Sequence, residues 1–213
     1  MNASSAAPDQ TVYIVDDDDA LRDSLVWLLE SNAHHVEQYA SAEAFLAAYH
    51  GEMAGCIVLD VRMPGMSGLE LYERLRERHA RLPVVFITGH GDVQMAVSML
   101  KKGAVDFIEK PFSDRDMLKL IDQCLATERE NRDRLRQDAA VERRLEHLTQ
   151  REMEVLELII AGRLNKQIAD DLGISIKTVE VHRARVMEKM EARSLAELVQ
   201  SVMTCQAARD RFS

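Results

Sequence analysis

The chain has 213 residues, of which 46% are hydrophobic and 30% charged, with a formal net charge of −9. This composition is typical of a globular protein that buries a core, and no run approaches about 18 apolar residues, so we expect no membrane span. Three widely spaced cysteines form neither a disulfide framework nor a metal-ligand cluster, which favours a cytoplasmic protein. Residues 1–10 lack the basic and apolar stretches of a signal peptide, and we expect a disordered start there.

The negative charge is unevenly distributed along the chain. Residues 1–127 hold 11 basic and 20 acidic side chains, a net of −9, whereas residues 128–147 hold six of each and residues 148–213 ten of each. All of the excess acid lies in the first 127 residues, which predicts two domains with different partners.

The first 127 residues alternate between strand-like and helix-like segments. Apolar, β-branched runs predict strands at 11–15, 34–39, 55–61, 82–88 and 104–108. Helical periodicity predicts helices over 19–31, 42–50, 67–79, 93–102 and from 114 onward. Capping-box spacing at Ser67/Glu70 and Ser113/Asp116 supports two of the helix starts. The alternation predicts an α/β fold, a five-stranded doubly wound parallel sheet that binds ligands at the carboxyl ends of its strands.

Residues 128–147 differ in character from what precedes them. They lack glycine and proline, mix both charge signs, and have only a thin apolar stripe at Leu135, Ala139 and Leu145. We interpret this segment as a mostly helical linker that extends the fifth helix. A disordered charged linker is the alternative.

From residue 148 to 213 the pattern is wholly helical, which predicts an all-α second domain. Its helices are expected at 150–161, 165–172, 176–190 and 195–208. The short turn GIS between the second and third of these has helix-turn-helix spacing. An αα-hairpin from a plain helical bundle is the alternative.

Four consecutive carboxylates, Asp16 to Asp19, follow the first predicted strand. Such a run can be a solvated turn that starts a helix, or a cation site, since Mg²⁺ selects carboxylate oxygens. The predicted sheet favours the cation site, because several polar residues fall at the carboxyl ends of its strands and therefore at one edge. These residues are Asp16, Asp17, Asp60, Thr88 and Lys110.

A carboxylate beside a cation, a lysine and a strand-end hydroxyl form a phosphoryl-transfer site. Asp60 can attack phosphorus, while the cation and Lys110 offset charge on the phosphoryl oxygens. Each residue alone has an ordinary explanation: Lys110 as a surface lysine, Thr88 as a strand end, Asp60 as a turn former. Their convergence at consecutive strand ends favours the site.

Residues 11–125 resemble the receiver domain of two-component response regulators, within a predicted domain of residues 11–127. The acidic pair and the motifs LDVRMPGMSG, ITGHGD and DFIEKPF carry the resemblance. It implies that Asp60 takes a phosphoryl group from the phosphohistidine of a sensor histidine kinase. It also implies that Mg²⁺ is bound directly by Asp17, Asp60 and the backbone carbonyl of Arg62, and through water by Asp16. Asp18 and Asp19 are then expected to begin the next helix.

The resemblance further implies a switch. A phosphoryl oxygen would draw the Thr88 hydroxyl inward, and the aromatic residue three positions before Lys110, here Phe107, would follow. Unlike the tyrosine often found at this position, phenylalanine has no hydroxyl that could form a hydrogen bond when the ring is exposed. The alternative is that Phe107 is simply a core residue. Lys110–Pro111 resembles the cis peptide of the family.

Residues 148–199, within a predicted domain of residues 148–213, resemble a LuxR-type DNA-binding domain through LTQRE, NKQIA, LGIS and KTVEVHRARVMEKM. A receiver followed by such a domain is the organisation of FixJ/NarL-type regulators. The residues of the last motif are closer to those of FixJ. At 100° per residue, the 176–190 helix should turn Val179 and Val186 inward and Val181 and Arg185 into the major groove. The expected DNA-contacting residues are Lys166, Lys177, Thr178, Val181, His182, Arg183 and Arg185.

These contacts differ in kind. Lys166, Lys177 and Thr178 are expected at phosphates, Val181 at a thymine methyl and Arg185 at a guanine edge. Arg183 falls on the inner side, with a stem that packs and a head that reaches a phosphate.

The second domain has no net charge, which predicts weak DNA binding by a monomer. We therefore expect two copies to bind a two-part promoter site on double-stranded DNA. The resemblance to FixJ implies a homodimer that forms on phosphorylation through residues 93–102 and 105–108. RNA polymerase is a further candidate partner. The resemblance implies a transcription regulator rather than an enzyme.

Two other hypotheses remain open. A haloacid-dehalogenase-type phosphatase would use Asp16 and Asp18, but Ala20 replaces the expected Thr or Val and Asp60 has no role there. A DNA-binding transcription factor with a vestigial receiver, indifferent to phosphorylation, would keep the fold without the switch. The intact strand-end residues argue against it.

Overall fold

The computed structural model describes residues 9–89, 103–205 and 208. Backbone contacts divide the chain into two compact units, with the boundary between Asn131 and Arg132. The helix and dimer surface predicted over 93–102 lie outside the described residues. Within the described part of the chain, no helix has both the length and the apolar character that a bilayer crossing requires.

The first unit contains a five-stranded, all-parallel sheet. Its strands are β1 (Thr11–Val15), β2 (Val36–Tyr39), β3 (Gly55–Asp60), β4 (Val84–Thr88) and β5 (Asp106–Glu109). They are arranged in the order β2-β1-β3-β4-β5. β1, β3 and β4 are buried along their whole length, as their continuous apolar runs predict. The predicted doubly wound α/β class is confirmed.

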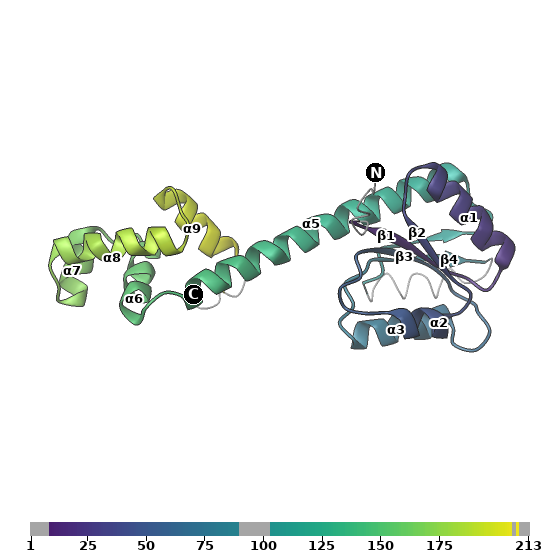
Figure 1. Cartoon of the computed structure of the whole chain (residues 1–213), viewed down its shortest axis with the longest axis horizontal. Coiled ribbons are helices and arrows are strands. Elements are labelled where there is room, and N and C mark those ends of the chain that lie inside the picture. The colour runs from purple at the N-terminus through teal and green to yellow at the C-terminus, as the bar shows by residue number, and fades with distance from the viewer. Residues whose placement is uncertain (1–8, 90–102, 206–207, 209–213) are drawn as a thin grey trace, which may run out of the picture. The chain divides into compact units, whose positions relative to one another are not determined.

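Helices cover both faces of this sheet (Figure 1). The α1 helix (Asp19–Ser31) and the start of α5 (Asp114–Glu146) pack on one face, where Leu25, Met117 and Ile121 share a core with β1 and β3. The α2 helix (Ala42–Ala48) and α3 (Gly68–Glu77) pack on the other face, around Phe45 and Leu71. The carboxyl ends of the strands are left at one edge of this layered unit, which positions the residues that follow them.

The helix starts follow from local hydrogen bonding. Asp18 caps α1 by accepting the amides of Ala20 and Leu21, so the second pair of acids in the run starts a helix as expected. Ser67 and Glu70 form a complete capping box on α3. These caps set where the turns after β1 and β3 end.

The α5 helix runs without a break through the segment predicted as a linker. Met117 and Ile121 near its start are buried in the first unit, and Val141 and Leu145 near its end are buried in the core of the second. Leu135 between them is 37% exposed. The thin apolar stripe of the sequence therefore contributes to the second core only in the last turns of the helix.

In the described part of the second unit, four helices follow α5. They are α6 (Gln150–Ile160), α7 (Asn165–Leu172), α8 (Ile176–Lys189) and α9 (Leu195–Thr204). Gly173 ends α7 at φ +63, a conformation that glycine adopts without strain. The α9 helix ends at Thr204, earlier than predicted, because Cys205 takes an extended backbone and buries its side chain.

Candidate functional sites

Four of the five predicted strand-end residues line one pocket, and Thr88 is not among its lining residues. The ammonium group of Lys110, after β5, donates to a carboxylate oxygen of Asp60 at 2.7 Å and to one of Asp16 at 3.2 Å. Asp16 and Asp60 are 1% and 6% exposed, whereas Asp17 is exposed. Asp17 and Arg62 also line the pocket, which has a volume of about 230 Å³. The topology therefore brings the adjacent Asp16 and Asp17 together with Asp60 and Lys110, which are far from them in the sequence.

Two like charges in this pocket, on Asp16 and Asp60, repel each other, and Lys110 attracts both. Burial raises the pKa of Asp16, and the neighbouring charge of Asp60 adds to that effect. Burial acts to lower the pKa of Lys110, but its hydrogen bonds and charge interactions with Asp60 and Asp16 outweigh this and raise it. One lysine thus balances two buried carboxylates, which leaves the pocket short of positive charge.

Asp16→Asn is expected to raise the free energy of unfolding by about 1 kcal/mol at neutral pH without divalent cations. The amide has the same shape, keeps an oxygen that can accept the Asp18 amide, and removes one of two buried acids that repel each other. Thermal unfolding of the full chain should show a midpoint several degrees higher, and Asp23→Asn at an exposed position of α1 should not. A lower midpoint for Asp16→Asn would mean that the bond to Lys110 outweighs the repulsion.

The turn after β3 holds Asp60 through its backbone. The amide of Arg62 donates to the second carboxylate oxygen of Asp60 at 2.7 Å. On the far side of the same turn, Glu43 of α2 accepts the amide of Met66 at 2.7 Å. Hydrogen bonds from its own backbone amide and from that of Met66 lower the pKa of Glu43. Sequence analysis missed this role of Glu43, because nothing in the sequence places α2 beside this turn.

Thr88 and Phe107 are the two residues that the sequence predicts to form a switch. The Thr88 side chain is fully buried at the end of β4, and its hydroxyl has no hydrogen-bond partner among the described residues. A buried hydroxyl without a partner is unfavourable, and an incoming acceptor oxygen would relieve that cost. Phe107 is half-buried and packs against the core on the α3 side of the sheet. The Lys110–Pro111 peptide is cis.

The pocket matches Mg²⁺ by ligand type. Asp16, Asp17 and Asp60 line it with carboxylates, and Mg²⁺ prefers oxygen ligands and retains several waters. Among the described residues, no group of three His, Cys, Asp or Glu side chains is arranged so that it could hold a metal ion by itself. This fits a cation that takes a few protein ligands and completes its shell with water and phosphoryl oxygens.

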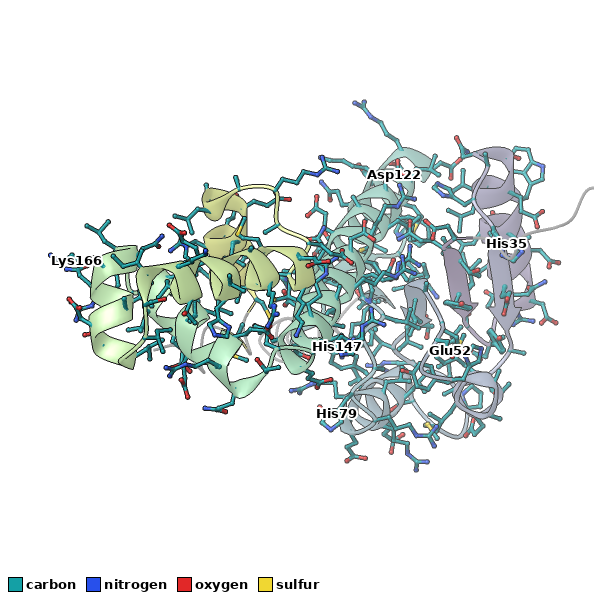
Figure 2. All side chains as sticks on the ribbon, turned by 60° about the vertical axis from the view of Figure 1, so that its left-hand side comes forward. His35, Glu52, His79, Asp122, His147 and Lys166 are labelled. Carbon is teal, nitrogen blue, oxygen red and sulfur yellow. The ribbon has the colours of Figure 1, made fainter. Side chains whose placement is uncertain are left out.

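The outer face of α8 presents three of the seven residues predicted to contact DNA. Lys177, Val181 and Arg185 are exposed, and Val179 and Val186 are buried in the core of the second unit. Lys166 of α7 is also exposed, and Figure 2 shows its side chain extending away from the ribbon. The helical period thus predicts the two faces of α8 well.

Three of the predicted DNA-contacting residues are less exposed. Thr178 is half-buried, and its amide donates at 3.0 Å to the hydroxyl of Ser175, which caps α8. Arg183 is half-buried, in agreement with a packed stem. Nδ1 of His182 is buried with no partner in the described part of the chain.

An ion pair between half-buried Lys189 and buried Glu152 anchors the C-terminal end of α8 to the start of α6. The Lys189 ammonium donates to Glu152 at 2.6 Å and to the carbonyl of His147 at 3.1 Å, and the Glu152 side chain is 2% exposed. Glu152 also closes the capping box with Thr149. The capping box is visible in the sequence, but the pair with Lys189 is not, because 37 residues separate its members.

The two units match two known families. Residues 12–122 match the response regulator receiver domain, and residues 146–202 match the luxR family of bacterial regulatory proteins. A receiver joined to a LuxR-type DNA-binding domain defines a two-component response regulator. Receiver domains generally use Mg²⁺ for phosphorylation.

Relatives of similar length narrow the family. The transcriptional regulatory protein FixJ of Azorhizobium caulinodans is 50% identical over 90% of this chain and 91% of its own. FixJ of Rhizobium meliloti is 47% identical over 92% and 96%. Among solved structures, the response regulator StyR has a TM-score of 0.83 at 45% identity, covering 92% of this chain and 98% of its own. Full-length FixJ from B. japonicum has a TM-score of 0.59 at 42% identity, covering 93% and 98%.

The chain therefore belongs to the FixJ-type two-component response regulators. Proteins of this type regulate transcription in response to phosphorylation, which implies a sensor kinase and DNA as partners.

Proposed function

We propose that Asp60 accepts the phosphoryl group from a sensor histidine kinase, and that this promotes dimerisation and DNA binding. The observation that carries the proposal is the Lys110 ammonium hydrogen-bonded to both Asp60 and Asp16 in a pocket open to solvent. A nucleophilic carboxylate, a fixed cation and oxygen ligands for a second cation are the parts that phosphoryl transfer requires.

In the transfer, a carboxylate oxygen of Asp60 forms a bond to phosphorus as the bond from phosphorus to the donor imidazole breaks. The imidazole nitrogen leaves with the electron pair of that bond, and the product is an aspartyl phosphate. Lys110 offsets the charge on the phosphoryl oxygens. Mg²⁺ would neutralise more of that charge, held by Asp17, Asp60 and the Arg62 carbonyl, and by Asp16 through water.

The phosphoryl group would then change the surface of the receiver. Its oxygens give the buried hydroxyl of Thr88 an acceptor, and Phe107 moves into the space that Thr88 vacates. We place the dimer contact on residues 93–102 and 105–108. The domain limits that go with this proposal are 11–127 for the receiver, 128–147 for the linker and 148–213 for the DNA-binding domain.

On the DNA side, we propose that Lys166, Lys177 and Thr178 contact phosphates and that Val181 and Arg185 contact bases. A dimer would bind a two-part promoter site, since pairing two weak modules raises their combined affinity. RNA polymerase is the further partner we propose. The protein would act in the cytoplasm, as a regulator with no external substrate to turn over.

Asp60→Asn is expected to abolish both phosphorylation and dimerisation. The full chain is incubated with Mg²⁺ and acetyl phosphate, then measured by intact-mass spectrometry and light scattering. Wild type should gain about 80 Da per phosphoryl group and convert from monomer to dimer. Asp60→Asn lacks the attacking oxygen and should do neither, whereas Asp23→Asn should behave as wild type.

The same measurement tests the alternative of a vestigial receiver. DNA binding that is equal in wild type and Asp60→Asn, with no mass gain in either, would favour a regulator indifferent to phosphorylation. A mass gain in Asp60→Asn would place the acceptor elsewhere and contradict the proposed role of Asp60.

A further inference from the structure

A buried arginine joins the two ends of the acidic run. Arg22 lies in the first turns of α1, is 8% exposed, and is the one buried arginine among the described residues. Its Nη1 donates to the backbone carbonyl of Asp16 at 2.7 Å, and its Nη2 pairs with the carboxylate of Asp19. Burying a guanidinium is costly, so a chain that does so needs its hydrogen bonds at that place.

The carbonyl held by Arg22 belongs to the peptide that links Asp16 to Asp17. A peptide is planar, so fixing its oxygen also fixes the direction in which the chain leaves β1. The Asp16 carboxylate has its own restraints, from the Asp18 amide at 2.8 Å and from Lys110. Asp17 is exposed, and the placement of its carboxylate depends on the backbone that carries it.

We propose that Arg22 is a positioning residue for the cation site: it locks the peptide between Asp16 and Asp17 so that both carboxylates face the pocket. Asp19 contributes by holding the other nitrogen of the guanidinium, which gives the fourth acid of the run a role. This inference rests on the proposed function, because it concerns the cation that phosphoryl transfer at Asp60 would use.

Arg22 is expected to affect Mg²⁺ affinity in two opposite ways, through its charge and through its hydrogen bonds. As a positive charge near the acids, Arg22 repels Mg²⁺, so its removal would tighten binding if charge dominated. Through its hydrogen bonds to the Asp16 carbonyl and the Asp19 carboxylate, the guanidinium holds the Mg²⁺ ligands in place. Its removal would therefore weaken Mg²⁺ binding if geometry dominated. Lysine separates the two effects, because it keeps the charge but lacks the planar fork that bonds a carbonyl and a carboxylate together.

The test is calorimetric titration of the full chain with MgCl₂, together with thermal unfolding and the Mg²⁺ dependence of phosphorylation by acetyl phosphate. We expect Arg22→Lys and Arg22→Met each to raise the Mg²⁺ dissociation constant about fivefold or more. The phosphorylation rate at saturating Mg²⁺ should stay within about twofold of wild type, because the acceptor Asp60 is intact. Asp19→Asn keeps the bond to the Asp16 carbonyl, and its effect should be smaller.

Three results would overturn the inference. Tighter Mg²⁺ binding by Arg22→Met with no change in Arg22→Lys would mean that Arg22 affects the site only through its positive charge. A lower unfolding midpoint with unchanged Mg²⁺ affinity in Arg22→Lys would reduce it to a structural residue; this variant also decides the matter if Arg22→Met does not fold. Wild type that neither binds Mg²⁺ nor gains a phosphoryl group would instead refute the proposed function, and the inference with it.

Discussion

Lys189→Met is expected to lower the free energy of unfolding of the second unit by about 3 kcal/mol. The substitution leaves the Glu152 carboxylate, which is 2% exposed, without its cationic partner. It also releases the C-terminal end of α8 from the carbonyl of His147. Because α8 carries the proposed base contacts, DNA binding should weaken together with stability.

Urea unfolding of the full chain, followed by circular dichroism, measures the loss. Arg163→Met is the matched control in the same unit: its ion pair with Asp171 spans 4.0 Å and both partners are exposed. An exposed pair of this kind contributes about 0–1 kcal/mol, so the control should change little. Equal effects of the two substitutions would mean that the pair of Glu152 and Lys189 is no stronger than a surface contact.

The same pair predicts a pH dependence. Burial alone would raise the pKa of Glu152, but hydrogen bonds from Lys189 and Thr149 lower it to about 2. A carboxyl whose pKa is lowered by folding stabilises the folded state above its unfolded pKa, which is about 4.3. The second unit should therefore lose this stability as the pH falls from about 4.5 toward about 2, and Lys189→Met should lose much less over that range.

Gly68→Ala is expected to destabilise the first unit by about 3 kcal/mol and to impair phosphorylation. A Cβ atom at Gly68 would lie 2.0 Å from the carbonyl oxygen of Asp60, and a backbone oxygen cannot move aside as a flexible side chain can. Either α3 or the end of β3 must shift. The Gly68 amide also donates to the carbonyl of Val61 at 3.1 Å, so the shift would disturb the turn that holds Asp60.

Gly51→Ala is the matched control, because a Cβ there meets nothing within 4 Å and its φ does not lie in the positive region that alanine avoids. It should be neutral or slightly stabilising. Thermal unfolding and the rate of phosphorylation by acetyl phosphate would compare the two variants. A Gly68→Ala protein as stable and as reactive as wild type would show that the turn after β3 adapts without moving Asp60.

Interactions between residues close in the sequence make most of the helices and strands predictable. The period of apolar residues separates the strands from the helices, and Ser67, Thr149 and Gly173 mark helix ends through local hydrogen bonds and local backbone angles. The 100° period of α8 separates buried Val179 from exposed Val181 without knowledge of the core. Even the meeting of Asp16 with Asp60 and Lys110 follows from sequence, since parallel strands bring their carboxyl ends to one edge.

The sequence by itself thus determined the two domains, the acidic edge and the outer face of α8. Tertiary structure alone decided which side chains hold those parts in place: Arg22 on the Asp16 carbonyl, Glu43 on the turn after β3, and Lys189 on Glu152. Periodicity and caps depend on neighbours within one or two turns, so they can be read along the chain. A hydrogen bond from a long side chain depends on which helix faces which loop, and only the packed fold settles that.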